Sequence, residues 1–386
     1  MKSLKNVLGK PAPESYPWAI WNWNGTITPE KITTQFKGFV DASFSGIVIR
    51  PSADMSPDFL SDEFLSRIEQ VVALAKEHSL QLRIYDDLTL KKSTLFSASV
   101  NQSVKLRAQR LVLEQSITPS EQDDLTLHID NPETAIVLAV KVSDHQISIA
   151  DTKQLTVKPD KNTIQWKAQA GEWRLILLRK QFTYDINNNF LPNLLNNKTV
   201  SIFTQLVLDP LKTLLEASGA VFSGFVTSIP SINPSDNGIP WDDDLIASYK
   251  TTFKKDLVKL LPAFFFESCT QSQKIRQQFY TFIFDSVNVN FITPLEAWLK
   301  KNHLSTWILF SDLSKRITLN ELDGEMISAG CVSQMCGLDS NKEIAENQEA
   351  LRLFANRRIL ERKGECVSII GHNQENTSSM LQHFKR

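Results

Sequence analysis

The sequence is poor in the residues that build metal sites, disulfide frameworks and nucleotide-binding loops. It contains four cysteines and six histidines, and no two cysteines form a CxxC pair. This spacing suits neither structural zinc nor dense disulfide bonding, so we expect reduced thiols and no metal site. The 13 glycines form neither a phosphate-binding loop nor a GxSxG nucleophile elbow. Their absence argues against nucleotide chemistry and against a serine hydrolase.

The chain also lacks an excess of charge and a long hydrophobic run. Lys and Arg total 42 against 43 Asp and Glu, for a formal net charge of -1. A face that binds nucleic acid needs a basic excess, so no nucleic-acid partner is expected. Apolar runs such as 260–266 fall far short of the ~20 residues that span a bilayer. Residues 1–10 lack the apolar core of a signal peptide, so we expect a cytoplasmic protein with no membrane partner and an oligomeric state that the sequence leaves open.

The first ninety residues alternate between strand and helix patterns. Strands are expected at 18–23, 47–49 and 82–85, and helices at 28–43 and 56–78. Asn24-Gly25 is a turn signal that ends the first strand, and Thr28-Pro29 is a typical helix start. Strands separated by helices in this way predict a parallel sheet.

Between residues 93 and 182 the pattern changes to short strands separated by turn-forming residues. Strands are expected at 125–129, 135–142, 147–149, 163–166 and 173–178. This spacing predicts a small β-sandwich. Residues 187–197 are rich in Asn and Leu and are interpreted as an exposed connection that returns to the first domain.

From residue 200 the alternation of helices and strands resumes. Strands are expected at 222–227, 306–310 and 366–370, with helices at 200–215, 245–260, 273–302 and 344–362. The count of parallel strands is then six or seven rather than eight. The sequence therefore predicts an α/β fold, a TIM-like (β/α) barrel of incomplete strand count with an inserted β-sandwich module. The expected division is 1–92 and 186–386 for the barrel, and 93–185 for the insertion.

Several segments resemble, in the same order along the chain, motifs of the α-L-rhamnosidase-like glycoside hydrolases of family 106. Residues 21–28 (WNWNGTIT) are similar to that family's tryptophan-rich opening and NGxIT turn. Residues 83–87 (RIYDD) are similar to its YDE strand end, and 171–174 (GEWR) to the closing strand of its inserted sandwich. Residues 224–230 (GFVTSIP) resemble its GxFTDEP strand end. Together the similar segments extend over nearly the whole chain.

The resemblance implies a sugar-binding pocket at the C-terminal ends of the barrel strands. In active members it implies hydrolysis of terminal α-L-rhamnosides with inversion, often with calcium at the site. This sequence departs from the family where catalysis needs carboxylates, because Ser228 and Ile229 replace the acidic pair of the TDEP strand end. The family's late glutamate aligns either with 361–362 or with 371–372, and the second is preferred because Glu361 lies in a helical pattern. His372 then occupies a strand end.

Glycoside hydrolysis needs two carboxyl groups on either side of the scissile bond, about 6.5–9.5 Å apart for inversion. Asp87 and Asp312 each follow an expected barrel strand, where βα loops hold active sites, and they are the candidates for acid and base. The alternative is that such an aspartate caps a helix or a turn, which is commoner. Asp242 opens an acidic run before a helix, and the helix dipole alone attracts such residues.

A wider set of residues is expected to contact the sugar: Trp21, Trp23, Asn24, Tyr85, Asp86, Asp242 and His372. Trp21 and Trp23 share one strand face, and aromatic rings stack on the apolar side of sugars, although tryptophan is also ordinary core. Two functional interpretations follow. One is a glycoside hydrolase acting on a rhamnose-like or other deoxysugar. The other is a catalytically inactive relative that serves as a carbohydrate-binding or protein-interaction scaffold, which the replacement at 228–229 and the short C-terminus favour.

Overall fold

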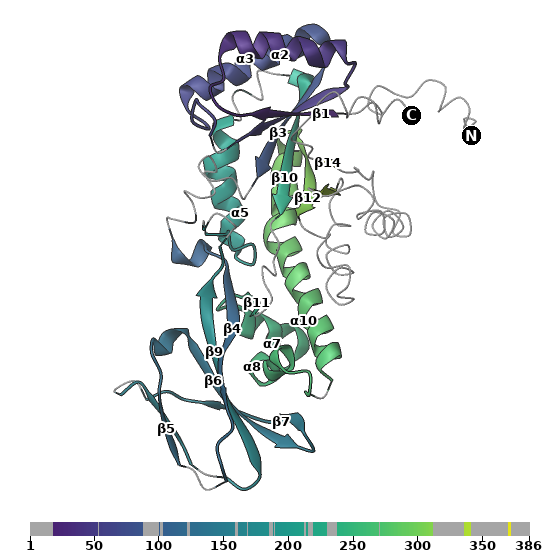
Figure 1. Cartoon of the computed structure of the whole chain (residues 1–386). Helices are drawn as coiled ribbons and strands as arrows, with labels where there is room; N and C mark the ends of the chain where they lie inside the picture. The colour runs from purple at the N-terminus through teal and green to yellow at the C-terminus, as the bar shows by residue number, and fades with distance from the viewer. Residues whose placement is uncertain are drawn as a thin grey trace, which may run out of the picture.

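A computed structural model describes residues 18–52, 54–87, 100, 103–121, 124–158, 161–167, 169–184, 188, 190–211, 214, 219–229, 238–269, 271–311, 336–340 and 370–371. Its architecture is mixed α/β. The described strands form a parallel sheet, an antiparallel sheet and a separate strand pair (Figure 1).

The parallel sheet holds seven described strands, which lie side by side in the order in which they occur along the chain. They are β1 (Trp18–Trp23), β2 (Gly46–Pro51), β3 (Gln81–Asp87), β10 (Phe222–Ile229), β12 (Ser305–Ser311), β13 (Cys336–Ser340) and β14 (Ile370–Gly371). Every neighbouring pair is parallel, so their C-terminal ends lie at one edge of the sheet. The sheet curls like half a barrel, and no pairing among the described residues joins β14 to β1.

Most of the expected parallel strands are confirmed. The predictions at 18–23, 47–49, 82–85, 222–227 and 306–310 correspond to β1, β2, β3, β10 and β12, whereas β13 was not predicted. The prediction at 366–370 overlaps β14 at Ile370. The helix expected at 344–362 lies outside the described residues.

Two helices follow β1 and β2, and their N-terminal caps fix where they begin. The helix α2 (Pro29–Asp41) begins where predicted, and Thr28 Oγ1 accepts a hydrogen bond from the Lys31 amide. The helix α3 (Asp62–His78) begins later than the predicted residue 56. Ser61 is the residue that caps it, accepting from the Phe64 amide at 3.2 Å, while Ser56 forms a β-bridge with Thr26. A cap residue with a side-chain acceptor is what sets a helix start, so the proline at 57 was a misleading signal.

One face of the parallel sheet forms a continuous hydrophobic core with the helices. Trp21 and Trp23 of β1 and alternate residues of β2 and β3 pack against α2 and α3. Further helical segments complete this core: α5 (Asn197–Phe203), the π-helical turns η4 (Thr204–Leu208) and η6 (Asn288–Ile292), and α11 (Thr293–Lys301). The core therefore joins the first ninety residues to the region beyond 190.

The second sheet is antiparallel and has the strand order β11-β4-β9-β6-β7. Its strands are β4 (Gln109–Ile117), β6 (Ala135–Ser143), β7 (Gln146–Leu155), β9 (Glu172–Phe182) and β11 (Gly238–Trp241), and the separate pair is β5 (Leu125–His128) with β8 (Thr163–Trp166). The predicted strands of the middle region are confirmed, but β4 and β11 were not predicted. Because β11 pairs with β4, this sheet includes a strand from beyond the expected insertion at 93–185.

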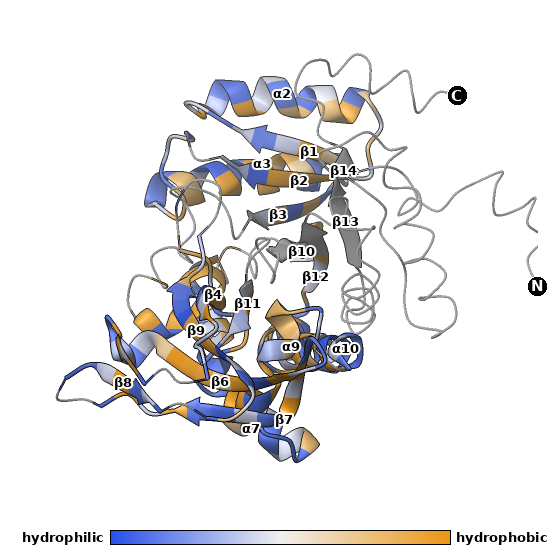
Figure 2. Cartoon of the chain, turned by 60° about the horizontal axis from the view of Figure 1, so that its bottom comes forward, coloured by the Kyte–Doolittle hydropathy of each residue, from blue (hydrophilic) through white to orange (hydrophobic). Residues whose placement is uncertain are grey.

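The two faces of the antiparallel sheet are covered differently. One packs on α7 (Leu245–Phe253), α8 (Leu257–Leu260), α9 (Pro262–Phe265) and α10 (Ser272–Val287). The other packs on β5 and β8, with Trp166 against Trp173 at 5.4 Å between ring centroids. Figure 2 shows the sheet with these helices beside it. The described part of the chain also holds three short 3-10 turns: η2 (Val104–Leu106), η3 (Pro132–Thr134) and η5 (Gly219–Val221). None of the described helices has the length and apolar character to cross a membrane.

The connection at 187–197 differs from the expectation of an exposed segment. Residues 191–194 are buried, and Leu194 belongs to the core of the parallel sheet. Asn193 is 3% exposed and satisfies its amide through the Lys105 carbonyl and the Asp242 carboxylate. Asn193 is therefore an internal hydrogen-bonding residue rather than part of an exposed connection.

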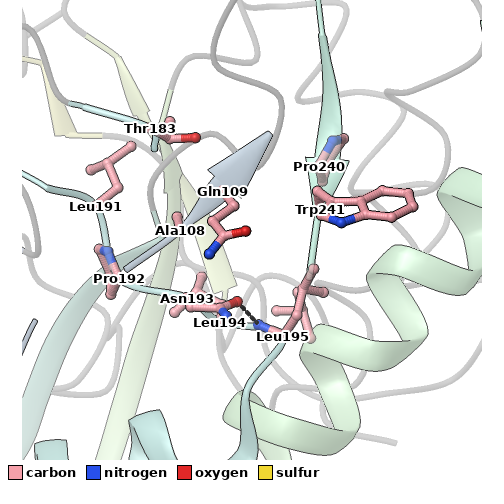
Figure 3. A pocket seen from close by; sticks show the side chains of 11 residues that line it. Ala108, Gln109, Thr183, Leu191, Pro192, Asn193, Leu194, Leu195, Pro240 and Trp241 are labelled. Atoms are coloured by element: carbon pink, nitrogen blue, oxygen red, sulfur yellow. Dashed lines mark hydrogen bonds between the residues drawn. The ribbon is translucent and has the colours of Figure 1, made fainter. Parts of the chain in front are cut away.

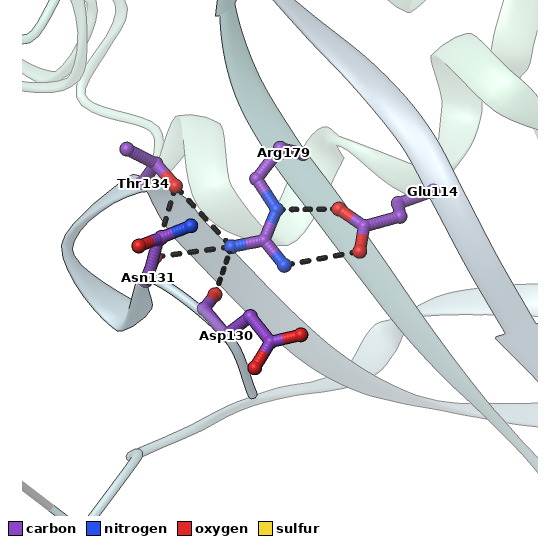
Figure 4. A network of polar contacts seen from close by, with 5 residues as sticks. All are labelled: Glu114, Asp130, Asn131, Thr134 and Arg179. Carbon is purple, nitrogen blue, oxygen red and sulfur yellow. Dashed lines mark hydrogen bonds and ion pairs between the residues drawn. The ribbon is translucent and has the colours of Figure 1, made fainter. Parts of the chain in front are cut away.

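A polar network fixes the centre of the antiparallel sheet (Figure 4). Glu114 is the extra residue of a bulge in β4, and both of its carboxylate oxygens accept hydrogen bonds from Arg179 of the neighbouring β9. Arg179 also donates to the carbonyls of Asp130 and Asn131 and to Thr134 Oγ1. The hydrogen bonds from Arg179 hold the pKa of Glu114 below its usual value.

We expect Glu114→Gln to lower the free energy of unfolding at neutral pH by about 1 kcal/mol, because the bidentate pair is charge-assisted but the carboxylate is 40% exposed. In the wild type this stabilisation is present above the unfolded-state pKa of Glu114 and is lost as the pH falls towards its lowered folded-state pKa. Urea unfolding at pH 7 and pH 3 should therefore show a smaller pH dependence for Glu114→Gln. Glu63→Gln, which removes an exposed pair with Arg67 within one helix, is the matched control and should cost only a few tenths of a kcal/mol.

Candidate functional site

The C-terminal edge of the parallel sheet brings together strand ends that are far apart in the sequence. β3 ends at Asp86 and Asp87, and the register pairs Asp87 with Ser228 of β10. β10 in turn pairs with β12, with Ile229 opposite Phe310. The strand end that carries the aspartates therefore lies directly beside the positions at which the acidic pair is replaced.

Asn24 lies at the same edge, directly after β1. Ser52, which follows β2, donates from its hydroxyl to the Trp23 carbonyl at 2.8 Å, and the Ser56 amide donates to the Gly25 carbonyl at 2.9 Å. Gly25 has a φ of +59°, a conformation that favours glycine in a turn of this kind. The two loops after β1 and β2 are thus tied together, and Asn24 is left exposed at the edge.

Asp312 and His372 follow β12 and β14 directly, and both lie outside the described residues. In the strand order β12 is two places from β3, whereas β14 is four places away. The topology therefore brings the end of β12 nearer to Asp87 than the end of β14. The assignments of Asp312 and His372 remain predictions.

Trp21 and Trp23 are core residues on the helix-facing side of the sheet. They are 4% and 0% exposed, and their rings meet edge to face at 5.6 Å between centroids. Trp21 donates from its indole nitrogen to Gln35 of α2 at 2.7 Å, and Trp23 packs against Phe64 of α3. Neither ring has a free face on which a sugar could stack, so the core alternative accounts for both.

The other face of the sheet, its inner face, holds a smaller cluster. Its buried members are Val48, Tyr85, Val226 and Trp307, with Trp18 and Ile20 packed beside them. Tyr85 is 1% exposed and lies under the guanidinium of Arg50, at 4.7 Å from the ring centroid. The side chain of Tyr85 is therefore not exposed for the predicted direct contact with a sugar. Asn22 has the strand parity of Ile20 and is exposed, so it is accessible from this face.

Arg83 ties three strands together on the inner face. Its guanidinium donates to the carbonyls of Phe225 on β10 and Ser305 on β12, and to the Ser305 hydroxyl at 2.8 Å. The guanidinium carbon is 4.3 Å from the Trp307 ring and 5.6 Å from that of Trp18. Burial lowers the pKa of Arg83 to about 9, because a charged group loses hydration there. Arg83 thus links the first ninety residues to β10 and β12 by direct bonds.

Asp242 serves the junction between the two sheets. Its carboxylate accepts from the Asn193 amide at 2.6 Å and from the Asp244 backbone amide at 2.8 Å. The adjoining cavity, between β4, β11 and residues 191–195, has a volume of about 30 Å³ (Figure 3). This is room for one or two water molecules but not for a sugar. The hydrogen bonds of Asp242 are thereby explained by structure, and this cavity among the described residues is too small for the predicted sugar contact.

The described residues hold no group of three or more His, Cys, Asp or Glu side chains that could bind a metal ion. Calcium takes six to eight oxygen ligands, and the adjacent pair Asp86 and Asp87 alone falls short of that number. The described residues therefore do not fit the calcium that the resemblance implies.

Three inner-face residues were not predicted, namely Asn22 and Arg50 towards this edge and Arg83 towards the opposite, N-terminal ends of the strands. A signal was present for each, because a polar or charged residue at alternate positions of an otherwise apolar strand marks the second face of a sheet. The sequence pattern did not reveal which of the two faces was covered by helices.

Comparison with solved structures finds a likeness to a rhamnosidase from Novosphingobium sp. PP1Y. The TM-score is 0.54 over 97% of this chain, with 10% sequence identity. This chain spans 57% of the length of that rhamnosidase chain. At this level of identity the likeness concerns the fold. No family model and no curated protein matches the chain.

Proposed function

We propose that this chain is a glycoside hydrolase-like protein that binds a carbohydrate at the C-terminal edge of its parallel sheet. The observation that carries the proposal is the sheet itself, whose parallel strands follow one another in sequence order. In (β/α) barrels this edge holds the ligand and the reacting groups. The fold likeness to a rhamnosidase supports a sugar as the ligand class.

In this proposal the parallel sheet is part of a TIM-like barrel, formed by residues 1–92 and 186–386 and interrupted by the insertion at 93–185. The C-terminal ends of β1, β2, β3 and β10 then lie around one cleft. Asn24, Asp86 and Asp87 belong to its rim by their positions at strand ends. Asn22 and Arg50 add polar groups from the inner face.

The catalytic version of the proposal assigns acid and base roles to Asp87 and Asp312. Neighbouring strands are about 4.8 Å apart, so two strand spacings put the ends of β3 and β12 about 10 Å apart. Inverting glycosidases hold their carboxyl groups about 6.5–9.5 Å apart, which leaves space for the attacking water. This spacing supports inversion, and the fold likeness to a rhamnosidase supports a terminal rhamnose-like sugar as substrate.

The second candidate function is carbohydrate binding without hydrolysis. Its supporting observation is the register that places Ser228 directly beside Asp87, because the strand next to β3 then supplies no carboxylate. Neither serine nor isoleucine at this edge replaces a general acid. We therefore expect low or absent turnover with binding retained.

A hydrolysis screen with aryl glycosides, including the α-L-rhamnoside, separates these functions. If the protein is an active enzyme, Asp87→Asn or Asp312→Asn should lower kcat/KM by at least about a hundredfold, as loss of an acid or base does. Asp285→Asn, an exposed position on α10, is the matched control and should leave turnover unchanged.

If the wild type hydrolyses none of these glycosides, the double variant Ser228→Asp/Ile229→Glu is the next protein to assay, because it restores the acidic pair. Turnover gained by this variant would support the inactive-relative version. A wild type and a double variant that neither cleave nor bind any glycoside would refute both.

A further inference from the structure

The segments that join the two sheets form a short neck, defined here as the described residues 100, 103–108, 182–184, 188 and 190–196. Both belong to the connection between β3 and α5, and a β-to-α connection leaves the sheet at its C-terminal edge. The two segments pair with each other, since the Ala108 amide donates to the Leu191 carbonyl at 2.8 Å and the Asn193 amide to the Leu106 carbonyl at 2.8 Å. The neck is therefore a defined structure beside the proposed sugar site.

The neck exposes aromatic and apolar surface. Within the neck, Tyr184 is 42% exposed and Val104 is 54% exposed. The third large hydrophobic residue exposed in the described part of the chain is Val289, which lies in η6 and outside the neck. One side of Tyr184 is covered by Phe190, with centroids 4.9 Å apart and an interplanar angle of 34°. Phe182 meets the same Phe190 edge to face at 5.4 Å. Phe190 thus covers one side of the Tyr184 ring, and among the described residues no second aromatic ring packs on its other side.

A cation is fixed next to these rings. The guanidinium carbon of Arg107 is 4.0 Å from the Phe190 centroid and 5.7 Å from that of Phe182. Its Nε donates to the Val100 carbonyl at 2.9 Å, and its terminal nitrogens form no hydrogen bond with the other described residues. Among the described residues no carboxylate forms an ion pair with Arg107. A stacked guanidinium whose terminal nitrogens have no partner in the described part of the chain is suited to bind a carboxylate in bidentate fashion.

We propose that Tyr184, Phe190 and Arg107 form an accessory platform for an acidic oligosaccharide. A pyranose ring stacks on the open face of Tyr184, and a uronate carboxylate binds the terminal nitrogens of Arg107. We expect the sugar to be acidic by charge complementarity, because the positive charge of Arg107 forms no ion pair with the described residues. The inference rests on the proposed carbohydrate function and extends it by naming a second contact region and a sugar class.

Affinity electrophoresis in gels that contain polygalacturonate, alginate or glucuronoxylan tests the platform, with a neutral galactan gel for comparison. The wild type should be retarded by at least one of the acidic polymers and less by galactan. Tyr184→Ala and Arg107→Gln should each weaken this binding about tenfold, equivalent to ~1.4 kcal/mol. Tyr184→Phe keeps the ring and should bind as the wild type does, and Val289→Ala is the control at an exposed apolar residue elsewhere.

Equal retardation of Tyr184→Ala and the wild type, or no retardation of the wild type by any acidic polymer, would overturn the platform. Failure of the edge site is a separate result. In that case Asp87→Asn leaves the binding of monosaccharides unchanged, while Tyr184→Ala still weakens the binding of polymers. Loss of preference for acidic over neutral polymers in Arg107→Gln would identify the cation as its source.

Discussion

Replacing Gly224 with alanine is expected to prevent stable folding or to lower the free energy of unfolding by about 4 kcal/mol or more. Gly224 follows a bulge in β10 and has a φ of +141°, a conformation that residues with a Cβ rarely adopt. A Cβ there would lie 1.8 Å from the backbone oxygen of Ser305 on β12. The clash is with backbone, so no rotamer change relieves it, and the contact between β10 and β12 would have to open.

Gly38→Ala is the matched control for this prediction. Gly38 lies in α2 and is exposed, and a Cβ added to it would meet no atom within 4 Å. The same substitution there should stabilise the helix by about 0.5–1 kcal/mol. Urea unfolding followed by circular dichroism compares the two variants. A Gly224→Ala protein as stable as the wild type would mean that β10 and β12 do not approach each other this closely.

Trp23→Ala is expected to lower the free energy of unfolding by about 3–5 kcal/mol, the usual cost of removing a large buried ring. Trp23 is 0% exposed and packs between Trp21 and Phe64. Trp23→Phe should cost less, because it keeps a ring and removes an indole N–H that has no hydrogen-bond partner. Chemical unfolding of the three proteins gives the comparison.

The same variants decide between the two roles considered for this tryptophan. If Trp23 is core, Trp23→Phe should bind sugar with the affinity of the wild type. A large loss of sugar affinity in Trp23→Phe with unchanged stability would instead show that the Trp23 ring contacts the sugar. The burial of Trp23 leads us to expect the first result.

Much of the parallel sheet could be predicted because its strands are short apolar runs bounded by turn and helix-cap signals. β11 could not be predicted in the same way, since its sequence GIPW contains Pro240, which lacks an amide hydrogen and usually argues against a strand. β11 tolerates it because it lies at the edge of the antiparallel sheet. β4 was missed because the bulge at Glu114 interrupts the alternation of inward and outward residues.

The candidate site was less predictable than the fold for a specific physical reason. Alternation along β1 shows that Trp21 and Trp23 share a face, but not whether that face meets helices or the inside of the curled sheet. Packing of the whole core decides this, and it placed both rings against α2 and α3. The position of Asp87 was easier, because a strand end is a local feature and its neighbour Ser228 follows from the parallel register.

The neck shows what sequence patterns leave out. Arg107, Phe182 and Phe190 are separated by up to about 80 residues in the chain, and only the pairing of the two crossing segments brings them together. No local pattern marks such a cluster. The asparagine-rich connection was likewise interpreted from composition, whereas its burial depends on contacts with Lys105 and Asp242.

The proposed function requires that a carbohydrate binds at the edge where β3 meets β10. Isothermal titration of the wild type and Asp87→Asn with a panel of deoxyhexoses, L-rhamnose included, tests it most directly. We expect saturable binding of at least one sugar by the wild type and affinity about tenfold lower in Asp87→Asn. Identical isotherms for the two proteins, or no binding of any sugar by the wild type, would contradict it.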